Sequence, residues 1–166
     1  MEQLGATRAD WILLSGKEIE VLGRACRRIR EAGRSAGNSP RIAWSAYLGW
    51  EEAMIEEIRP HFTYIATDMP ADLRRAAGID DDTATRIQAI MLKEGMEAAA
   101  RLLPDEAVRR FAVVGTRDRA VEEIGRIREE ARPDMFLLPV NDYTRAGEFV
   151  RAASAVLAEA GFGRSQ

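Results

Sequence analysis

The segment FAVVGTRDRAVEEIGRIREEARPDMFLLPVND, residues 111–142, joins a short apolar run, a charged helix and a second apolar run. Thr116 stands where an N-cap hydroxyl accepts a hydrogen bond from the first helical turn, and Pro133 ends the helix. Met135–Leu138 has no polar alternation, and this pattern predicts a strand buried on both faces, as in a parallel sheet. The residues after it lie at the carboxyl end of the strand, where α/β folds build their ligand sites.

The charged helix of this segment carries one apolar face. Its apolar residues recur at helical spacing and are Ala120, Val121, Ile124 and Ile127. A helix with one buried face that leads into a buried strand is typical of α/β proteins.

Composition sets the broad class. The chain has 166 residues, of which 46% are hydrophobic and 31% charged, and we expect one soluble domain covering residues 1–166. A net charge of −3 gives no electrostatic indication of a nucleic-acid or membrane partner. Cys26 is the single cysteine, so no intramolecular disulfide can form, as expected of a reducing compartment. The sequence also lacks a secretion signal and an apolar run near twenty residues, so we expect a cytoplasmic protein.

The N-terminal part repeats the alternation of strand and helix. The expected elements are a helix at 1–9, a buried strand at 10–14 ended by Ser15 and Gly16, a helix at 17–36 and a strand at 41–50. Each strand is followed by helix, so a right-handed parallel arrangement is expected. The first helix has no strand before it, and we expect the pattern to belong to something longer.

The strand at 41–50 alternates in character. Ile42, Trp44, Ala46 and Leu48 point to one side, and Ala43, Ser45 and Tyr47 to the other. Small Ala43 and Ser45 beside Tyr47 suit either a barrel interior that must leave room or ordinary core packing, and the pattern favours neither.

Residues 51–110 are read as a helical insertion, since about fifty residues of short helices separate two strands and a plain βα unit needs far fewer. The acidic run Asp80–Asp82 lacks the spacing of a calcium loop and indicates a helix N-terminus, so no metal site is predicted. His61, the only histidine, is interpreted as structural or exposed. No Walker loop, dinucleotide-binding or catalytic-elbow motif is present.

Four stretches carry a resemblance to a known family. "LGATRADWILLSG", "MEAAARLLPDEAVRR", "FAVVGT" and "LLPVND" resemble, in this order, the C-terminal half of luciferase-like monooxygenases. These are flavin- or deazaflavin-dependent TIM-barrel oxidoreductases, including the methylenetetrahydromethanopterin reductase type. The resemblance implies a partial (β/α)8 barrel of about its last three βα units, with the helical insertion before the last barrel helix.

The resemblance also implies a function and a site. It implies hydride transfer between FMN or the deazaflavin coenzyme F420 and an organic substrate, and it leaves cofactor and substrate open. The cofactor-binding rim is expected at the carboxyl ends of the three strands and comprises Ser15, Gly16, Trp50, Asn141 and Asp142. No catalytic residue can be assigned.

An alternative interpretation is a non-catalytic half-barrel domain. Three strands cannot close a barrel of eight, so the open edge near Trp11 must be hidden. We therefore expect self-association, or a partner chain that supplies the missing strands, and no activity of this chain alone.

Overall fold

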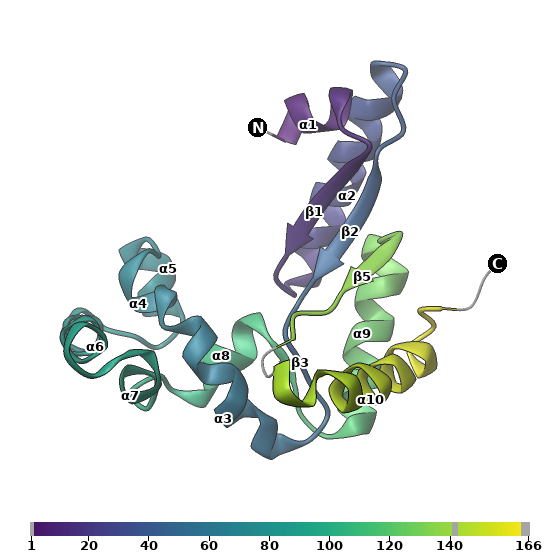
Figure 1. Cartoon of the computed structure of the whole chain (residues 1–166). Helices are drawn as coiled ribbons and strands as arrows, with labels where there is room; N and C mark the ends of the chain where they lie inside the picture. The colour runs from purple at the N-terminus through teal and green to yellow at the C-terminus, as the bar shows by residue number, and fades with distance from the viewer. Residues whose placement is uncertain (1, 141–142, 164–166) are drawn as a thin grey trace.

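The fold is α/β, with parallel strands and helices that follow them (Figure 1). The computed structural model describes residues 2–140 and 143–163. In the described part, no helix is both long and apolar enough to cross a lipid bilayer.

A parallel sheet of three strands lies at the centre. β1 (Trp11–Ser15), β2 (Arg41–Ser45) and β5 (Met135–Leu137) stand in the order β1-β2-β5. Leu13 lies opposite Ala43, which lies opposite Met135 on the far strand. The first and last parts of the chain therefore meet on the two edges of β2.

The strand predicted at 41–50 is divided into two. β2 ends at Ser45, and β3 (Leu48–Gly49) pairs in parallel with β4 (Val113–Val114) as a separate small sheet. The Tyr47 carbonyl accepts a hydrogen bond from the Val113 amide at 2.9 Å, so the second half of the predicted strand follows a new neighbour. The described residues thus contain five strands in two sheets instead of the three expected.

Four helices pack against one side of the sheet. They are α1 (Glu2–Arg8), α2 (Ile19–Ser35), α9 (Arg117–Ala131) and α10 (Ala146–Glu159), the last preceded by the short η3 (Tyr143–Arg145). Thr116 caps α9 as predicted, since its hydroxyl accepts a hydrogen bond from the Arg119 amide. The predicted apolar face of α9 is confirmed by Ala120, Ile124 and Ile127, which are buried.

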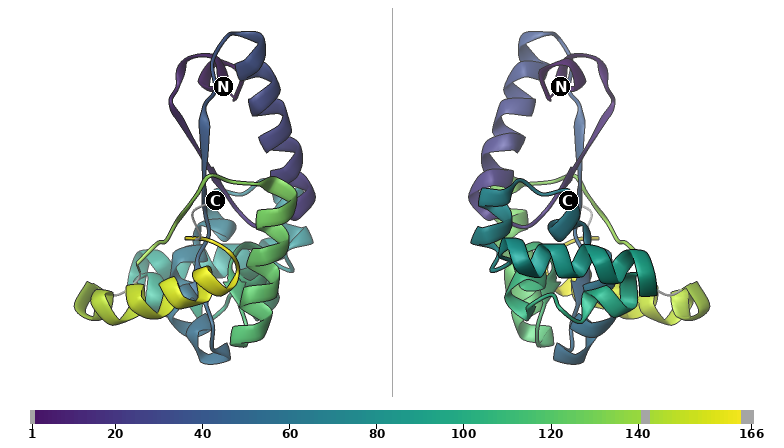
Figure 2. Two further views of the ribbon diagram at one scale, coloured as in Figure 1. Left: turned by 90° about the vertical axis from the view of Figure 1, so that its right-hand side faces the viewer. Right: turned by 90° about the vertical axis from the view of Figure 1, so that its left-hand side faces the viewer.

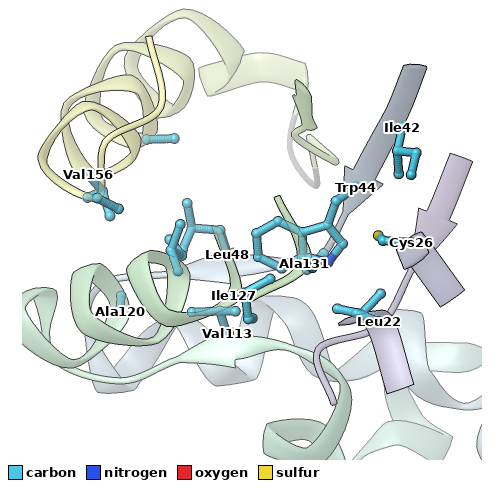
Figure 3. Close-up of a cluster of buried hydrophobic side chains, with 14 of the residues drawn as sticks. Leu22, Cys26, Ile42, Trp44, Leu48, Val113, Ala120, Ile127, Ala131 and Val156 are labelled. Carbon is cyan, nitrogen blue, oxygen red and sulfur yellow. The ribbon is translucent and has the colours of Figure 1, made fainter. Parts of the chain in front are cut away.

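Trp44 lies in the middle of the main core (Figure 3). It is 1% exposed, and its ring meets Phe136 edge-on with 4.8 Å between centroids. The residues predicted to point to one side of the strand at 41–50 all belong to this core, which confirms that set. Cys26 is buried in the same cluster, and burial raises the pKa of its thiol.

The other face of the three-stranded sheet is open, and this corrects the prediction of strands buried on both faces. Leu13 is 59% exposed, and Met135 and Leu137 are each 40% exposed. The strands were predicted to be buried on both faces because every residue in the runs is apolar. In the structure, the helices of the main core pack against one side of the sheet only.

Short helices fill the chain between β3 and β4. They are η1 (Glu52–Met54), α3 (Ile55–Ile58), η2 (Arg59–Phe62), α4 (Tyr64–Thr67), α5 (Ala71–Ala76), α6 (Asp81–Glu94), α7 (Met96–Ala100) and α8 (Asp105–Phe111). Figure 2 shows them gathered at the end of the molecule away from α1. They have a hydrophobic core of their own, which includes Ile58, Ile65 and Ile87.

Two polar contacts stabilise these short helices. Asp80 caps α6 by accepting a hydrogen bond from the Thr83 amide at 2.7 Å, which confirms that the acidic run marks a helix N-terminus. Arg59, which is 7% exposed, donates to the buried Leu103 carbonyl at 2.5 Å and to the carboxylates of Glu56 and Asp105. One buried guanidinium therefore holds η2 against the start of α8.

Candidate functional site

A cavity of about 360 Å³ opens at the carboxyl ends of β1 and β2. We call it the carboxyl-end pocket. Its walls come from the β1–α2 turn, the end of β2 and the short helices η2, α4 and α8. The lining residues are Ser15, Gly16, Lys17, Glu18, Val21, Leu22, Ser45, Ala46, Tyr47, Phe62, Tyr64, Arg110, Phe111 and Pro139. The pocket lies where parallel α/β folds bind their ligands.

The turn after β1 forms one rim of this pocket. Gly16 has a φ of +95°, a backbone conformation that other residues rarely adopt, and it lets the chain turn from β1 toward α2. The Trp44 indole N–H donates a hydrogen bond to the Gly16 carbonyl with 2.6 Å between the atoms. A core side chain on β2 therefore positions the turn that carries Ser15 and Gly16.

Two tyrosines, Tyr47 and Tyr64, also line the pocket. Tyr47 stacks on His61 with 5.0 Å between ring centroids and contacts Phe62 edge-on at 5.2 Å. Burial raises the pKa of Tyr47, and burial together with the nearby Tyr47 raises the pKa of Tyr64. Both phenols therefore stay protonated at neutral pH and can donate hydrogen bonds.

The structure shows where Ala43, Ser45 and Tyr47, the second side of the strand predicted at 41–50, lie. Ser45 and Tyr47 line the pocket, whereas Ala43 is buried against its neighbours. Of the three small or polar positions, two thus leave room for a ligand and one packs in the interior.

The pocket also contains two cations that sequence reasoning missed. The Lys17 ammonium is 2.6 Å from a Glu123 carboxylate oxygen. Arg110 donates to the Ala76 carbonyl at 2.7 Å and to Glu18 at 3.2 Å. Lys17 directly follows the predicted Ser15 and Gly16, so extending the rim by one residue would have found it. Arg110 lies far along the sequence and gives no local signal.

Of the five predicted rim residues, the structure describes three, and it places Ser15 and Gly16 in one cavity and Trp50 in another. Ser15 and Gly16 line the carboxyl-end pocket, but Trp50 lines another cavity of about 280 Å³ beside α10. There its ring lies 5.3 Å from that of Phe149. Asn141 and Asp142 fall outside the residues that the structure describes.

Comparison with known protein families identifies the family of this chain. The profile of the family described as "Luciferase-like monooxygenase" matches residues 1–134, which is most of the chain. The chain belongs to the luciferase-like monooxygenase family. No curated protein sequence matches.

Solved structures of other proteins share the fold. The coenzyme F420-dependent tetrahydromethanopterin reductase from Methanopyrus kandleri superposes with a TM-score of 0.67 and 21% identity, covering 90% of this chain and 46% of that one. The EDTA monooxygenase from Chelativorans sp. BNC1 gives 0.58 and 18%, covering 99% and 45%. A long-chain alkane monooxygenase gives 0.57 and 18%, covering 99% and 40%. The chain spans less than half the length of these three structures.

The side chains of the carboxyl-end pocket define what it can bind. Phe62, Phe111 and Leu22 offer an apolar wall, and the hydroxyls of Tyr47 and Ser45 offer polar contacts. A mostly apolar lining with a few polar groups is typical of small-molecule sites.

Proposed function

We propose that the chain is the C-terminal segment of a luciferase-like oxidoreductase that uses FMN or a deazaflavin coenzyme. The reaction would transfer hydride between the cofactor and an organic substrate. The observation that carries this proposal is the carboxyl-end pocket of a chain that belongs to this family. Two similar structures add support: the coenzyme F420-dependent reductase described above, and a riboflavin lyase whose structure contains a modified FMN.

The residues present fit the ring of such a cofactor. Leu22 and Phe111 would contact its flat faces, and the hydroxyls of Ser15, Ser45 and Tyr47 would hydrogen-bond to its polar edge. The bound cofactor supplies the redox chemistry, and the protein binds it, orients it and excludes water. Ser15 and Gly16 would act at the cofactor, and Trp50 at the rim of the neighbouring cavity.

We further propose that this chain acts together with other barrel strands. Its 166 residues would form a single unit of a partial TIM barrel, with residues 51–110 as a helical insertion that covers the pocket. The exposed Leu13, Met135 and Leu137 on the open sheet face support a partner that covers them. Alone, the chain would bind FMN weakly and would not turn over.

A second candidate function is a non-catalytic half-barrel domain. The same open apolar face supports it, because two copies could cover each other's sheets without any cofactor. This candidate predicts association of the chain but no response of the pocket to a flavin.

Binding of FMN, mapped by amide chemical shifts on the labelled chain, tests the proposal. We expect changes at Ser15, Gly16 and Tyr47 that saturate only well above micromolar FMN. The same titration with F420 distinguishes the two cofactors. Ser45→Phe, which fills the pocket, should abolish the changes, and Ser154→Phe on the exposed side of α10 should keep them.

Each outcome of this titration has a definite meaning. Amides of the pocket that stay unmoved by both cofactors would refute the cofactor site and favour the half-barrel domain. Micromolar affinity would refute the claim that the site needs further strands.

A further inference from the structure

The carboxyl-end pocket is uneven in chemistry. Its apolar lining includes Leu22, which is mostly buried, and the rings of Phe62 and Phe111, which stack with 6.2 Å between their centroids. The charged side chains that line the pocket are Lys17, Glu18 and Arg110. Lys17 is paired with Glu123, and Arg110 is paired with Glu18. A ligand that fills this space thus meets an apolar wall and, at the border, two ion pairs, of which that of Arg110 is the more exposed.

The two cations differ in how firmly they are held. Lys17 and Glu123 are 2.6 Å apart, and both side chains are mostly buried, with 15% and 22% exposed. Arg110 and Glu18 are 3.2 Å apart and are 36% and 51% exposed. An exposed ion pair of this kind contributes little stability, so a competing anion can replace its carboxylate.

The orientation of Arg110 does not depend on that carboxylate alone. Its Nη1 atom donates to the Ala76 carbonyl at 2.7 Å, and its Nη2 atom faces Glu18. An incoming anion can therefore take the place of Glu18 at Nη2 while the backbone carbonyl keeps the guanidinium in position.

We propose that the carboxyl-end pocket takes a flat, apolar organic anion, whose ring packs on the partly exposed Phe111 and whose negative group binds Arg110 in exchange for Glu18. This proposal rests on the proposed function, because it names the ligand chemistry of the same pocket. The volume of about 360 Å³ suits a small ring system. The protonated hydroxyls of Tyr47 and Tyr64 favour an anion as well, since they donate hydrogen bonds to it.

The test compares two probes of equal shape. 2-Naphthoate is the anion and 2-naphthylmethanol its neutral counterpart, each titrated into the whole chain by calorimetry and amide chemical shifts. We expect naphthoate to bind about tenfold more tightly than the alcohol and to move amides around Arg110 and Phe111.

Variants that remove one charge show whether Arg110 strengthens and Glu18 weakens the binding of naphthoate. Arg110→Gln should weaken naphthoate about fivefold, whereas Glu18→Gln should strengthen it about twofold, and neither should change the alcohol. Arg24→Gln breaks another exposed ion pair, with Glu20 on α2, and controls for net charge. Circular dichroism confirms that each variant is folded, and Glu18→Gln keeps the test decisive if Arg110→Gln does not fold.

Three results would overturn the proposal. They are equal binding of the two probes, a loss of naphthoate affinity with Glu18→Gln, or an Arg24→Gln effect as large as that of Arg110→Gln. If naphthoate does not bind but FMN still shifts the pocket amides, only this inference is refuted and the proposed function stands. Naphthoate binding without a flavin response would keep the anion site and remove the proposed oxidoreductase.

If naphthoate binds as expected, a competition experiment shows whether the natural anion is the cofactor or the substrate. Displacement of naphthoate by FMN would assign the anionic ring to the cofactor. Simultaneous binding of both would assign it to the substrate.

Discussion

Replacing Trp44 with phenylalanine tests how the core positions the pocket. Trp44 is 1% exposed, packs on Phe136 and donates its indole N–H to the Gly16 carbonyl. The substitution keeps an aromatic ring but removes the hydrogen bond and part of the side-chain volume. It should therefore destabilise the fold and release the turn that carries Ser15 and Gly16.

The magnitude follows from three contributions. The lost hydrogen bond costs about 1 kcal/mol. The smaller ring buries about 40 Å² less apolar surface, which costs about 1 kcal/mol. A residual cavity of about 40 Å³ costs about another 1 kcal/mol at the usual penalty per volume. Trp44→Phe should therefore lower the free energy of unfolding by about 3 kcal/mol.

Urea unfolding followed by far-ultraviolet circular dichroism measures this loss without relying on tryptophan emission. Trp50→Phe is the matched control, because Trp50 is half-buried and contacts the Phe149 ring. We expect the control to lose less than about 1 kcal/mol. Equal losses in the two variants, or a loss below about 1 kcal/mol in Trp44→Phe, would refute the reasoning.

Three further predictions concern other parts of the chain. The wild-type chain should self-associate at micromolar concentrations in sedimentation velocity, and Leu13→Lys on the open sheet face should weaken this; a wild-type chain that stays monomeric would contradict the prediction. Arg59→Met leaves the buried Leu103 carbonyl without its donor and should cost about 2 kcal/mol in urea unfolding, while an unchanged midpoint would contradict the assigned contact. The Thr83 amide lowers the pKa of Asp80, so the cap stabilises the folded state above the unfolded-state pKa and is lost as pH falls through the lower folded-state pKa. Asp80→Ala should therefore have a lower melting temperature than the wild type at neutral pH, and the gap should close in strong acid; a gap that persists there would exclude the carboxylate as its cause.

Local patterns predicted the parts of this protein that depend on local interactions. Thr116 and Asp80 cap their helices as the sequence indicated, because an N-cap needs only a side-chain oxygen two or three residues before the amide that it accepts from. The inward set on the strand at 41–50 was also readable, since side chains of a strand alternate regardless of the partner.

The open sheet face could not be predicted from its residues. The runs around Leu13 and Met135 are apolar throughout, and in parallel sheets such runs are typical of strands covered on both faces. Whether a sheet face is covered depends on which helices pack against it. Here the helices of the main core pack against one side of the sheet. The division of the strand at Tyr47 has the same origin, because its carbonyl pairs with Val113, which lies far along the chain.

The sequence by itself therefore determined the alternation of helix and strand, the helix caps and the buried side of the strand at 41–50, all of which depend on near neighbours in the chain. Only the tertiary structure brought Arg110 to the same pocket and placed Trp50 in a different cavity. The reason is that a binding pocket is made by segments that meet after folding, and the distance between two side chains across it is set by the packing of whole elements.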